Sequence, residues 1–349
     1  MGNLSARLWS GCALRTVLVT GIDGGAAQSV VKCLRKAGGY HIIVTGVDPL
    51  GIGLHLGDAG YLMPFDWEDY KKRLHKISLQ EKVKIIIPGS DIELEHFAKY
   101  RKWYETLLPP MIIDYQNIKY ARDKYLLQEW LHGSGFPYIK TWLEKDLDKT
   151  DTLVVLKPRS GFGSNMLFKQ VRPEWAQVLG KYIKDQGWEP IAQEWVRGDE
   201  YSCMVLRAKD GELLGTMVAW SVKKYGQSFK TKMIIDPEIE ELVNKVSEKL
   251  NSIGPLSVQL MRTPKGELKI FELNARFTGA QIVRAEAGFN MPDAAIRNWL
   301  DEEKIYGKVD KPLIAYWYHD FGYSKPETLD KLTREGKIKK GEMNCPKYL

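Results

Sequence analysis

Three polar side chains of the segment 271–279 (FELNARFTG) have the types and spacing of a metal and phosphate site. Glu272, Asn274 and Arg276 are two residues apart, so in a strand all three project from one face. Carboxylate and amide oxygens are hard ligands for magnesium, and a guanidinium is a planar cation suited to a phosphoryl group. The segment therefore predicts a magnesium and phosphate site, although a polar strand face at the rim of a sheet would explain the triplet alone.

A strand predicted just before this one brings a further oxygen ligand to the same place. Residues 256–261 (LSVQLM) have the pattern of a strand and lead to a turn at 263–266 (TPKG). A hairpin closed by that turn places Gln259 beside Glu272. We therefore add Gln259 to the predicted metal site.

A lysine followed by a glycine-rich segment predicts a phosphate-binding loop. Lys157 ends an apolar strand, and the loop 160–164 can fold its amides over phosphate oxygens while the lysine supplies a point charge. The candidate nucleotide contacts of this loop are Ser160, Gly161, Gly163 and Ser164. A glycine-rich hairpin with a surface lysine is the alternative, and the segment is not a P-loop because no Gly-Lys-Ser or Gly-Lys-Thr follows.

The segment 193–200 (QEWVRGDE) has the features of a nucleotide linker. An apolar strand ends near Glu194, and Trp195 and Val196 follow it before a second acid, Glu200. The backbone of such a linker can pair with a purine edge, and the second carboxylate can accept hydrogen bonds from ribose hydroxyls. A strand that leads into a turn explains the segment equally well.

The N-terminal part of the chain alternates apolar strands with helical patterns, which is typical of a parallel sheet covered by helices. The predicted strands and helices lie at 16–20, 27–36, 41–47, 67–79, 84–87 and 111–114. From about residue 117 the pattern of predicted elements changes, and strands predominate between helices. We therefore predict an α/β protein with a Rossmann-like N-terminal domain.

Composition and charge indicate an ordinary soluble globular protein. Hydrophobic residues make up 44% and charged residues 27% of the 349 residues, and the net charge of +7 is spread along the chain. The one basic run, at 331–340 (KLTREGKIKK), suits a solvated surface better than a nucleic-acid footprint. No apolar run approaches the roughly 20 residues of a membrane span, so we expect neither a nucleic-acid nor a membrane partner.

The four cysteines show no spacing typical of a metal site. Cys33 falls in a helical pattern and Cys203 in a strand pattern, so we expect both to be buried thiols, whereas Cys12 and Cys345 lie near the termini. This usage favours a reducing cytoplasm.

Taken in order along the chain, these segments resemble the ATP-grasp superfamily, in particular the branch of biotin carboxylase and the carbamoyl-phosphate synthase large subunit. The resemblance covers roughly residues 117–320, and its most specific part is Glu272-x-Asn274-x-Arg276 downstream of a strand glutamine. It implies a Rossmann-like domain followed by a two-lobed α+β ATP-grasp domain. The implied boundaries are an extension at 1–15, the Rossmann-like domain at 16–116, the ATP-grasp domain at 117–325 (small lobe about 124–194, large lobe about 195–325) and a polar tail at 326–349.

The resemblance also implies roles for the residues at the nucleotide. Lys124 and Lys157 would hold the α- and β-phosphates under the glycine loop. Glu194, Trp195 and Val196 would form the adenine hinge, and Glu200 would bind ribose. Glu272, Asn274 and Gln259 would hold two Mg²⁺ ions, with Mn²⁺ as an alternative ion, and Arg276 would contact the γ-phosphate and the acyl phosphate. Arg276 and Lys157 are thus the expected catalytic residues.

The implied activity is that of a stand-alone, ATP-dependent carboxylate–amine ligase. In carbamoyl-phosphate synthase a second arginine follows the first by three positions, whereas Gly279 stands here, so a bicarbonate-type substrate is less expected than a small carboxylate such as an amino acid. The candidate substrate contacts are Gly24, Ser90, Asp91, Glu93, Lys223, Lys232, Thr278, Gly279 and Arg284. Among relatives a homodimer through the N-terminal domain is the expected assembly.

Two alternatives belong to other functional classes. The loop 21–25 (GIDGG) with Asp48 at the end of the second strand resembles a dinucleotide-binding fingerprint, which would make the protein an NAD(P)-dependent oxidoreductase. The glycine spacing departs from GxGxxG, and no Tyr-x-x-x-Lys pair follows. The other alternative is a nucleotide-binding regulator without turnover, which would not need Arg276 in register with the metal ligands.

Overall fold

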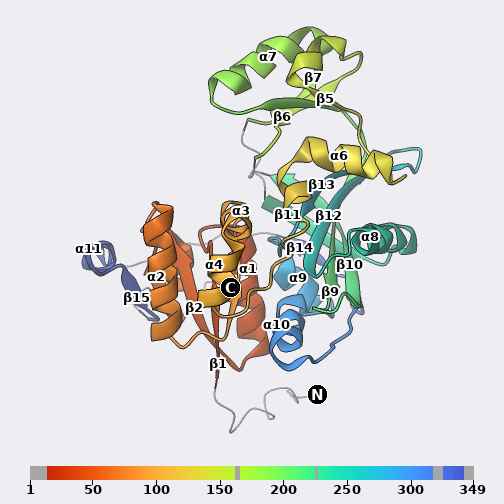
Figure 1. Cartoon of the computed structure of the whole chain (residues 1–349). Helices are drawn as coiled ribbons and strands as arrows, with labels where there is room; N and C mark the ends of the chain where they lie inside the picture. Colours follow the sequence, from red (N-terminus) through yellow and green to blue (C-terminus); the bar gives the residue numbers. More distant parts are fainter. Residues whose placement is uncertain (1–13, 162–165, 225–226, 317–324, 342–349) are drawn as a thin grey trace.

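The computed structural model describes residues 14–161, 166–224, 227–316 and 325–341. An N-terminal α/β domain lies beside a large antiparallel sheet, and a small lobe stands at one end of the two (Figure 1). No helix among the described residues is long and apolar enough to cross a membrane.

The N-terminal domain is a mostly parallel sheet with helices on its faces. Four strands, β1 (Arg15–Val19), β2 (Tyr40–Gly46), β3 (Ala59–Leu62) and β4 (Ile85–Ile87), pair in parallel in the order β3-β2-β1-β4. The helical segments are α1 (Gly25–Ala37), η2 (Ile52–His55), α2 (Trp67–Gln80), α3 (Asp91–Lys99) and α4 (Arg101–Leu107). The predicted strand at 111–114 is only an isolated bridge between Met111 and Ile86, and β3 has no counterpart in the sequence-based prediction.

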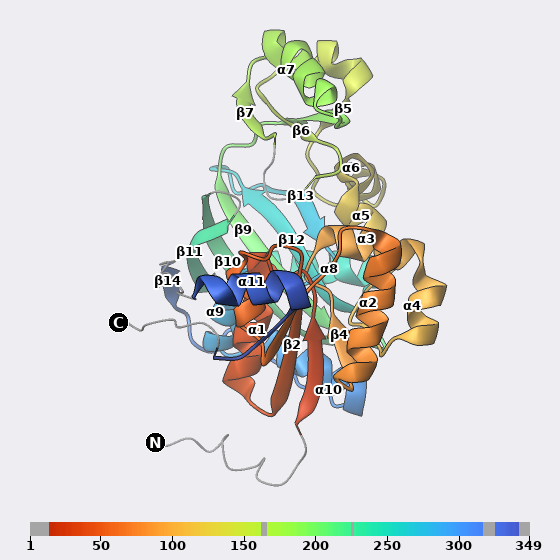
Figure 2. The ribbon, with the colours of Figure 1, turned by 90° about the vertical axis from the view of Figure 1, so that its left-hand side faces the viewer.

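Residues 326–341, which the sequence-based prediction assigns to a polar C-terminal tail, add a helix and an edge strand to the same sheet. After α11 (Pro326–Glu335), β15 (Lys337–Lys339) pairs antiparallel with β3 and extends the sheet at its edge (Figures 1 and 2). Ile338 is 1% exposed between two outward lysines, and Leu332 of α11 is also 1% exposed. One buried side chain per element is enough to anchor a segment whose composition is otherwise polar.

Two short helices, α5 (Ile118–Arg122) and α6 (Lys124–Gly133), connect the N-terminal domain to the rest. Asp123 separates the two helices with extended backbone angles. The Asp123 side chain accepts a hydrogen bond from the Leu126 amide at 2.9 Å, which makes it the N-cap of α6. The break places Lys124 at the first position of the second helix.

The small lobe is a four-stranded antiparallel sheet with its own core. Its elements are β5 (Thr141–Leu143), η3 (Glu144–Lys149), β6 (Val154–Pro158), β7 (Phe168–Val171), α7 (Pro173–Asp185) and β8 (Pro190–Glu194), with strand order β5-β8-β6-β7. A separate hydrophobic cluster that includes Trp142, Leu156 and Ile183 lies between this sheet and α7.

The large lobe is a six-stranded sheet in the order β13-β12-β9-β10-β11-β14, antiparallel throughout. Its elements are β9 (Asp199–Arg207), β10 (Leu213–Lys224), β11 (Gln227–Ile234), α8 (Pro237–Lys249), β12 (Gly254–Arg262), β13 (Leu268–Asn274), α9 (Gln281–Glu286), α10 (Met291–Asp301) and β14 (Ile314–Tyr316). One core packs α8 on the sheet, and the opposite face contributes to the core shared with the N-terminal domain.

Helix α1 joins the N-terminal domain to the large lobe through that shared core. Val30 and Leu34 of α1 belong to the same buried cluster as Ile296 of α10. Polar contacts add to this packing, since the Ile282 amide donates to Ser29 Oγ at 2.9 Å. The two parts are therefore one packed unit, and the space between them is set by the fold.

Candidate active site

A single large cavity collects most of the residues that the sequence singles out. Its volume is about 920 Å³, and it is lined by the carboxyl ends of β1 and β4, by one face of the β9, β12 and β13 strands, and by the small lobe. Crevices at the carboxyl ends of parallel strands are a common location for ligands in α/β proteins.

The β12–β13 hairpin forms the oxygen-rich floor of this cavity. Gln259 is the cross-strand partner of Glu272, as the sequence predicts, and Asn274 Nδ2 lies 3.3 Å from Glu272 Oε1. Gln259, Glu272 and Asn274 all line the cavity. One carboxylate and two amide groups on one sheet face supply hard oxygen donors, which suits a magnesium ion whose remaining ligands come from phosphates and water.

The same donor set argues against a metal held by protein side chains alone. Within the described residues no group of three or more His, Cys, Asp or Glu side chains is placed to hold a metal ion. A hard cation at this hairpin would therefore need nucleotide phosphates to complete its coordination. Metal and nucleotide binding are expected to depend on each other.

Two buried lysines face the floor from the small-lobe side. Lys124 donates a hydrogen bond to the Gly161 carbonyl at 3.1 Å, and Lys157 Nζ lies 5.9 Å from the centre of the Phe271 ring. Burial lowers the pKa of Lys124, although the charge of Glu272 opposes that shift. Both lysines line the cavity.

The predicted linker follows β8 at the cavity wall. Glu194, Trp195, Val196 and Glu200 all line the cavity. The Trp195 amide donates to the Leu153 carbonyl at 2.8 Å and is therefore engaged within the protein. Backbone contacts to a purine would come instead from the remaining groups of the linker, such as the Val196 amide.

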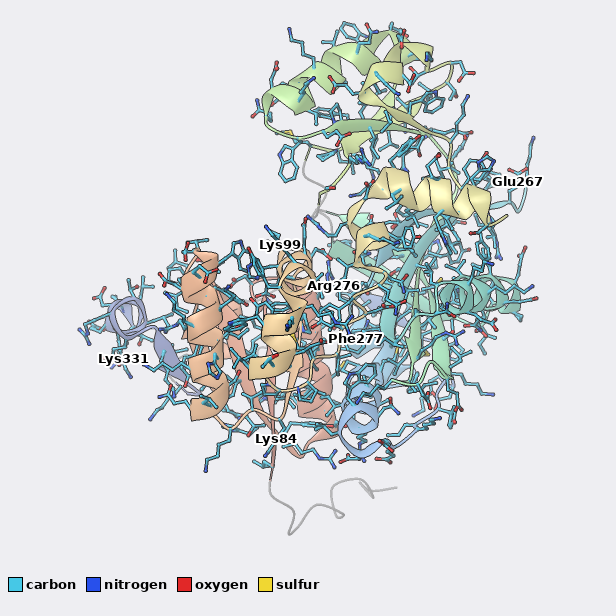
Figure 3. All side chains as sticks on the ribbon, in the orientation of Figure 1. Lys84, Lys99, Glu267, Arg276, Phe277 and Lys331 are labelled. Carbon is cyan, nitrogen blue, oxygen red and sulfur yellow. The ribbon has the colours of Figure 1, made fainter. Side chains whose placement is uncertain are left out.

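Arg276 lies between the large sheet and the N-terminal domain and is paired with Asp91 (Figure 3). Arg276 Nε donates to Asp91 Oδ1 at 2.8 Å, Nη2 to Asp91 Oδ2 at 2.5 Å, and Nη1 to the Phe277 carbonyl at 3.0 Å. Burial alone would raise the pKa of Asp91, but the charge and hydrogen bonds of Arg276, together with nearby cations, outweigh it and the pKa is lowered. This bidentate pair connects the end of β13 to the start of α3.

The N-terminal wall contains a buried carboxylate with hydroxyl partners. Thr20 Oγ1 donates to Glu93 Oε2 and Tyr70 Oη donates to Glu93 Oε1, both at 2.6 Å. Burial and, to a smaller extent, the charge of Asp23 raise the pKa of Glu93 to about 7 against the effect of these hydrogen bonds. Glu93 lines the cavity together with Gly24, Ser90 and Asp91, as the sequence predicts.

Comparison with known proteins identifies the part of the chain that carries this floor. A family model described as an ATP-grasp domain matches residues 121–280. The chain contains an ATP-grasp domain. The fold of this domain binds Mg·ATP, and the match spans the two lysines, the linker and the oxygen-rich hairpin.

Solved structures share the fold of this chain over most of its length. The biotin carboxylase domain of 2-oxoglutarate carboxylase from Hydrogenobacter thermophilus, solved with Mg·ADP and bicarbonate, is 18% identical with a TM-score of 0.67, over 87% of this chain and 74% of that one. N5-carboxyaminoimidazole synthetase from Staphylococcus aureus is 18% identical with a TM-score of 0.66, over 93% and 86% of the two chains.

Biotin carboxylase from Campylobacter jejuni is 13% identical with a TM-score of 0.66, over 81% and 70% of the two chains. These similarities show the same fold, so the predicted Rossmann-like domain with two antiparallel lobes is confirmed. No curated protein matched the chain in sequence.

Some residues that line the cavity are not predicted from the sequence. Phe271 lines the cavity beside Glu272 because the β12–β13 register shifts between Gln259 and Leu260, and this β-bulge breaks the strict alternation of faces. Exposed Lys169 of β7 also faces the cavity, from a strand whose sequence carries no signal for a ligand.

Some predicted site residues do not line the cavity. Ser160 and Lys232 are outside it, and Lys232 is the exposed partner of Trp220 in the β10–β11 pair. Gly163 and Ser164 lie outside the described residues, as does the side chain of Lys223. By contrast, Thr278 and Gly279 line the cavity directly after Arg276.

Arg284 is a further exception, because it lies wholly beneath the cavity. Its side chain is 0% exposed, and Nη2 donates to the carbonyl of Ser202, which itself lines the cavity. Within the described residues its Nε and Nη1 have no partner, and burial lowers its pKa to about 10. Such groups commonly retain buried water, so Arg284 supports the floor and does not reach into the predicted acceptor pocket.

The loop 21–25 does not support the dinucleotide alternative. Asp48, which would bind the ribose, is not among the cavity residues, and its Oδ1 accepts a hydrogen bond from the Leu50 amide at 2.9 Å. The loop itself faces the same cavity as the ATP-grasp hairpin. Gly21, Asp23, Gly24 and Gly25 of the loop thus line the same space as Glu272 and Asn274.

Proposed function

We propose that this protein is an Mg²⁺-dependent ligase that activates a small carboxylate as an acyl phosphate and joins it to an amine, releasing ADP and phosphate. The observation that carries the proposal is the shared cavity. Lys124, Lys157 and Arg276 face an oxygen-rich hairpin, and the N-terminal wall closes the same space from the other side. The site can thus hold a nucleotide and a second ligand next to each other.

The order of steps follows from the chemistry of carboxylates. A carboxylate is a poor electrophile, and transfer of the γ-phosphoryl group to it provides a good leaving group. Lys157 and Arg276 would neutralise charge that spreads over the transferred group, while Glu272, Asn274 and Gln259 would hold the Mg²⁺ ions that do the same. The amine, which must give up its ammonium proton to react, then attacks the acyl carbon, forms the C–N bond, releases a second proton and displaces phosphate.

The wall next to Arg276 supports an acceptor other than bicarbonate. Gly279 leaves no side chain three residues after Arg276, and the neighbouring wall residues from β1, β4 and α3 add volume. The biotin carboxylase domain noted above was solved with bicarbonate. The absence of a side chain at Gly279 is consistent with an acid larger than bicarbonate.

An assay of ADP release tests this function. Purified protein with Mg·ATP should release ADP only when a carboxylate from a panel of amino acids and an amine are both present. Lys157→Ala should raise the KM for ATP by at least tenfold. Lys140→Ala should leave it unchanged, because Lys140 is 56% exposed, pairs with Asp151 and does not line the cavity. An absence of nucleotide turnover with every acid would favour the inert regulator.

A further inference from the structure

The N-terminal wall of the cavity has charges of one sign only. The cavity residues that precede Ala121 include three carboxylates, Asp23, Asp91 and Glu93, and no lysine, arginine or histidine. All the basic residues that line the cavity come from the ATP-grasp domain. The wall formed by the N-terminal domain is therefore acidic, whereas the wall formed by the ATP-grasp domain contains all the basic residues of the cavity.

Two of the three carboxylates have no cation to balance them. Asp91 is neutralised by its bidentate pair with Arg276. Among the described residues no lysine, arginine or histidine forms an ion pair with Asp23 or Glu93, and the Asp23 side chain accepts only from the Val47 and Asp48 amides. Two adjacent carboxylates at a cavity wall raise each other's energy unless a cation is bound there.

The Glu93 carboxylate is held rigidly and is open to the cavity on one side. Thr20, Tyr70 and the Ser90 amide all donate to it. The chain also passes closely above it, since a Cβ on Gly21 would lie 2.9 Å from Glu93 Oε2. With three donors fixed, one acceptor position of this carboxylate remains for a ligand.

The rest of this wall is apolar and aromatic. Phe65, which is 81% exposed, lines the cavity with Met63, Pro64, Trp67 and Tyr70. Trp67 stacks on His96 with ring centres 4.0 Å apart, which fixes its orientation. Exposed aromatic surface next to unpaired carboxylates suits a cation on an apolar body, through burial and cation–π attraction together.

We infer that the N-terminal wall binds the amine substrate as an ammonium ion carried on an apolar or aromatic body, with Glu93 and Asp23 contacting the ammonium group and Phe65 and Trp67 contacting the body. This inference rests on the proposed function, since it assigns that reaction's amine to one wall. It excludes amines that carry a phosphate or a second anionic group at this wall, because no basic side chain is there to receive it.

Binding of the ammonium group should depend on pH in a defined direction. The groups that face Glu93 are Thr20, Asp23, Tyr70 and Tyr104, and burial raises the pKa of both tyrosines above the physiological range. Burial raises the pKa of Glu93 to about 7, so its carboxylate form is lost as the pH falls through neutrality. Affinity for an ammonium ion should therefore fall between pH 8 and pH 6.

Calorimetric titration with three simple probes tests the inference on the full chain. Phenethylamine, which stays protonated from pH 6 to pH 8, is compared with 2-phenylethanol and with phosphoethanolamine. We expect phenethylamine to bind at least tenfold more tightly than either at pH 8, and to lose affinity at pH 6. Glu93→Gln should abolish both the preference and the pH dependence.

Two variants control the result. Glu95 lies on the same helix as Glu93, but its side chain is 62% exposed and pairs with Arg122. The Glu95→Gln variant should therefore bind phenethylamine like the wild type. Asp23→Asn changes an exposed residue and tests the wall even if Glu93→Gln fails to fold. Equal affinity for amine and alcohol, or tighter binding of phosphoethanolamine, would overturn the inference.

A separate titration with a non-hydrolysable Mg·ATP analogue distinguishes this inference from the proposed function. Nucleotide binding without an ammonium preference would refute the wall assignment alone. An ammonium preference without nucleotide binding would refute the ligase and leave the wall assignment intact.

Discussion

Arg276 shows how one residue can serve two partners. Its guanidinium has five N–H donors, and Asp91 and the Phe277 carbonyl accept from three of them. Two N–H groups remain for an anion without any break in the Asp91 pair. We therefore interpret Asp91 as the residue that orients Arg276, in place of the substrate contact that the sequence suggests.

Removal of the Asp91 charge tests this interpretation through stability. Asp91→Asn leaves Arg276 buried without its counter-charge, which should lower the free energy of unfolding by about 3 kcal/mol. Glu105→Gln, which breaks an exposed pair with Arg101, should cost less than about 0.5 kcal/mol. Urea titration measures the free energy of unfolding of both variants. Equal losses of stability would show that the buried Asp91–Arg276 pair stabilises the fold no more than an exposed pair does.

The oxygen-rich hairpin makes a prediction about the metal. Glu272→Gln removes the only carboxylate of the set and should reduce Mg²⁺-dependent ADP release by at least about 100-fold, with the circular dichroism spectrum unchanged. Gln259→Glu, at the opposite cross-strand position, keeps an oxygen ligand and should retain activity. Full ADP release by Glu272→Gln would remove the hairpin from the metal site.

At the scale of elements, local sequence patterns predict the hairpin and the loops, but they do not predict every contact between residues distant in the sequence. The turn 263–266 and the alternation of Glu272 and Asn274 are local features, so the pairing with Gln259 can be predicted. The bulge that turns Phe271 toward the cavity depends on register, and β15 joins β3 across most of the chain length. Neither leaves a periodic signal in the sequence.

The turn after β4 shows how tightly the N-terminal wall is assembled. A Cβ on Gly89 would lie 2.4 Å from the Thr20 carbonyl and 2.5 Å from Ala27 Cβ, so the strand end and the start of α1 are in direct contact there. Gly89→Ala should therefore lower the free energy of unfolding by about 1–3 kcal/mol.

A second glycine provides the matched control for that variant. A Cβ on Gly133, at the end of α6, meets no atom within 4 Å, so Gly133→Ala should be neutral or stabilising by up to about 1 kcal/mol. Thermal denaturation compares the two. Equal stabilities would mean that the wall adjusts freely around position 89.

At the scale of the whole molecule, the N-terminal domain and the large lobe share one core, while the small lobe has its own. The proposed nucleotide contacts Lys157 and Glu194 come from the small lobe, and the hairpin comes from the large one. A bound nucleotide should therefore link two separately packed units. Ligand binding of this kind raises the stability of the whole chain.

Calorimetry can measure that linkage. A nucleotide analogue at 100 times its Kd should add about 2.7 kcal/mol to the free energy of unfolding. The rise in Tm should need both Mg²⁺ and the analogue, because the hairpin alone does not complete a metal site. Lys157→Ala should remove most of the rise, and an equal rise without Mg²⁺ would contradict the proposed dependence.

The buried Glu93 should also make the stability of the ligand-free protein depend on pH. Its pKa rises on folding from 4.5 to about 7, so its contribution to stability is fully present below pH 4.5 and is lost as the pH rises through 7. Between pH 5 and pH 8 the Tm of the wild type should thus fall relative to that of Glu93→Gln. Parallel curves would show that Glu93 does not titrate in the fold.

The transfer of oxygen between substrates tests the central claim most directly. The protein is incubated with Mg·ATP, an amine panel and the twenty standard amino acids labelled with ¹⁸O in their carboxylates, and the products are analysed by mass spectrometry. Activation as an acyl phosphate predicts ADP, a condensed product and phosphate that carries one ¹⁸O atom. Unlabelled phosphate, or AMP with pyrophosphate, would contradict the account.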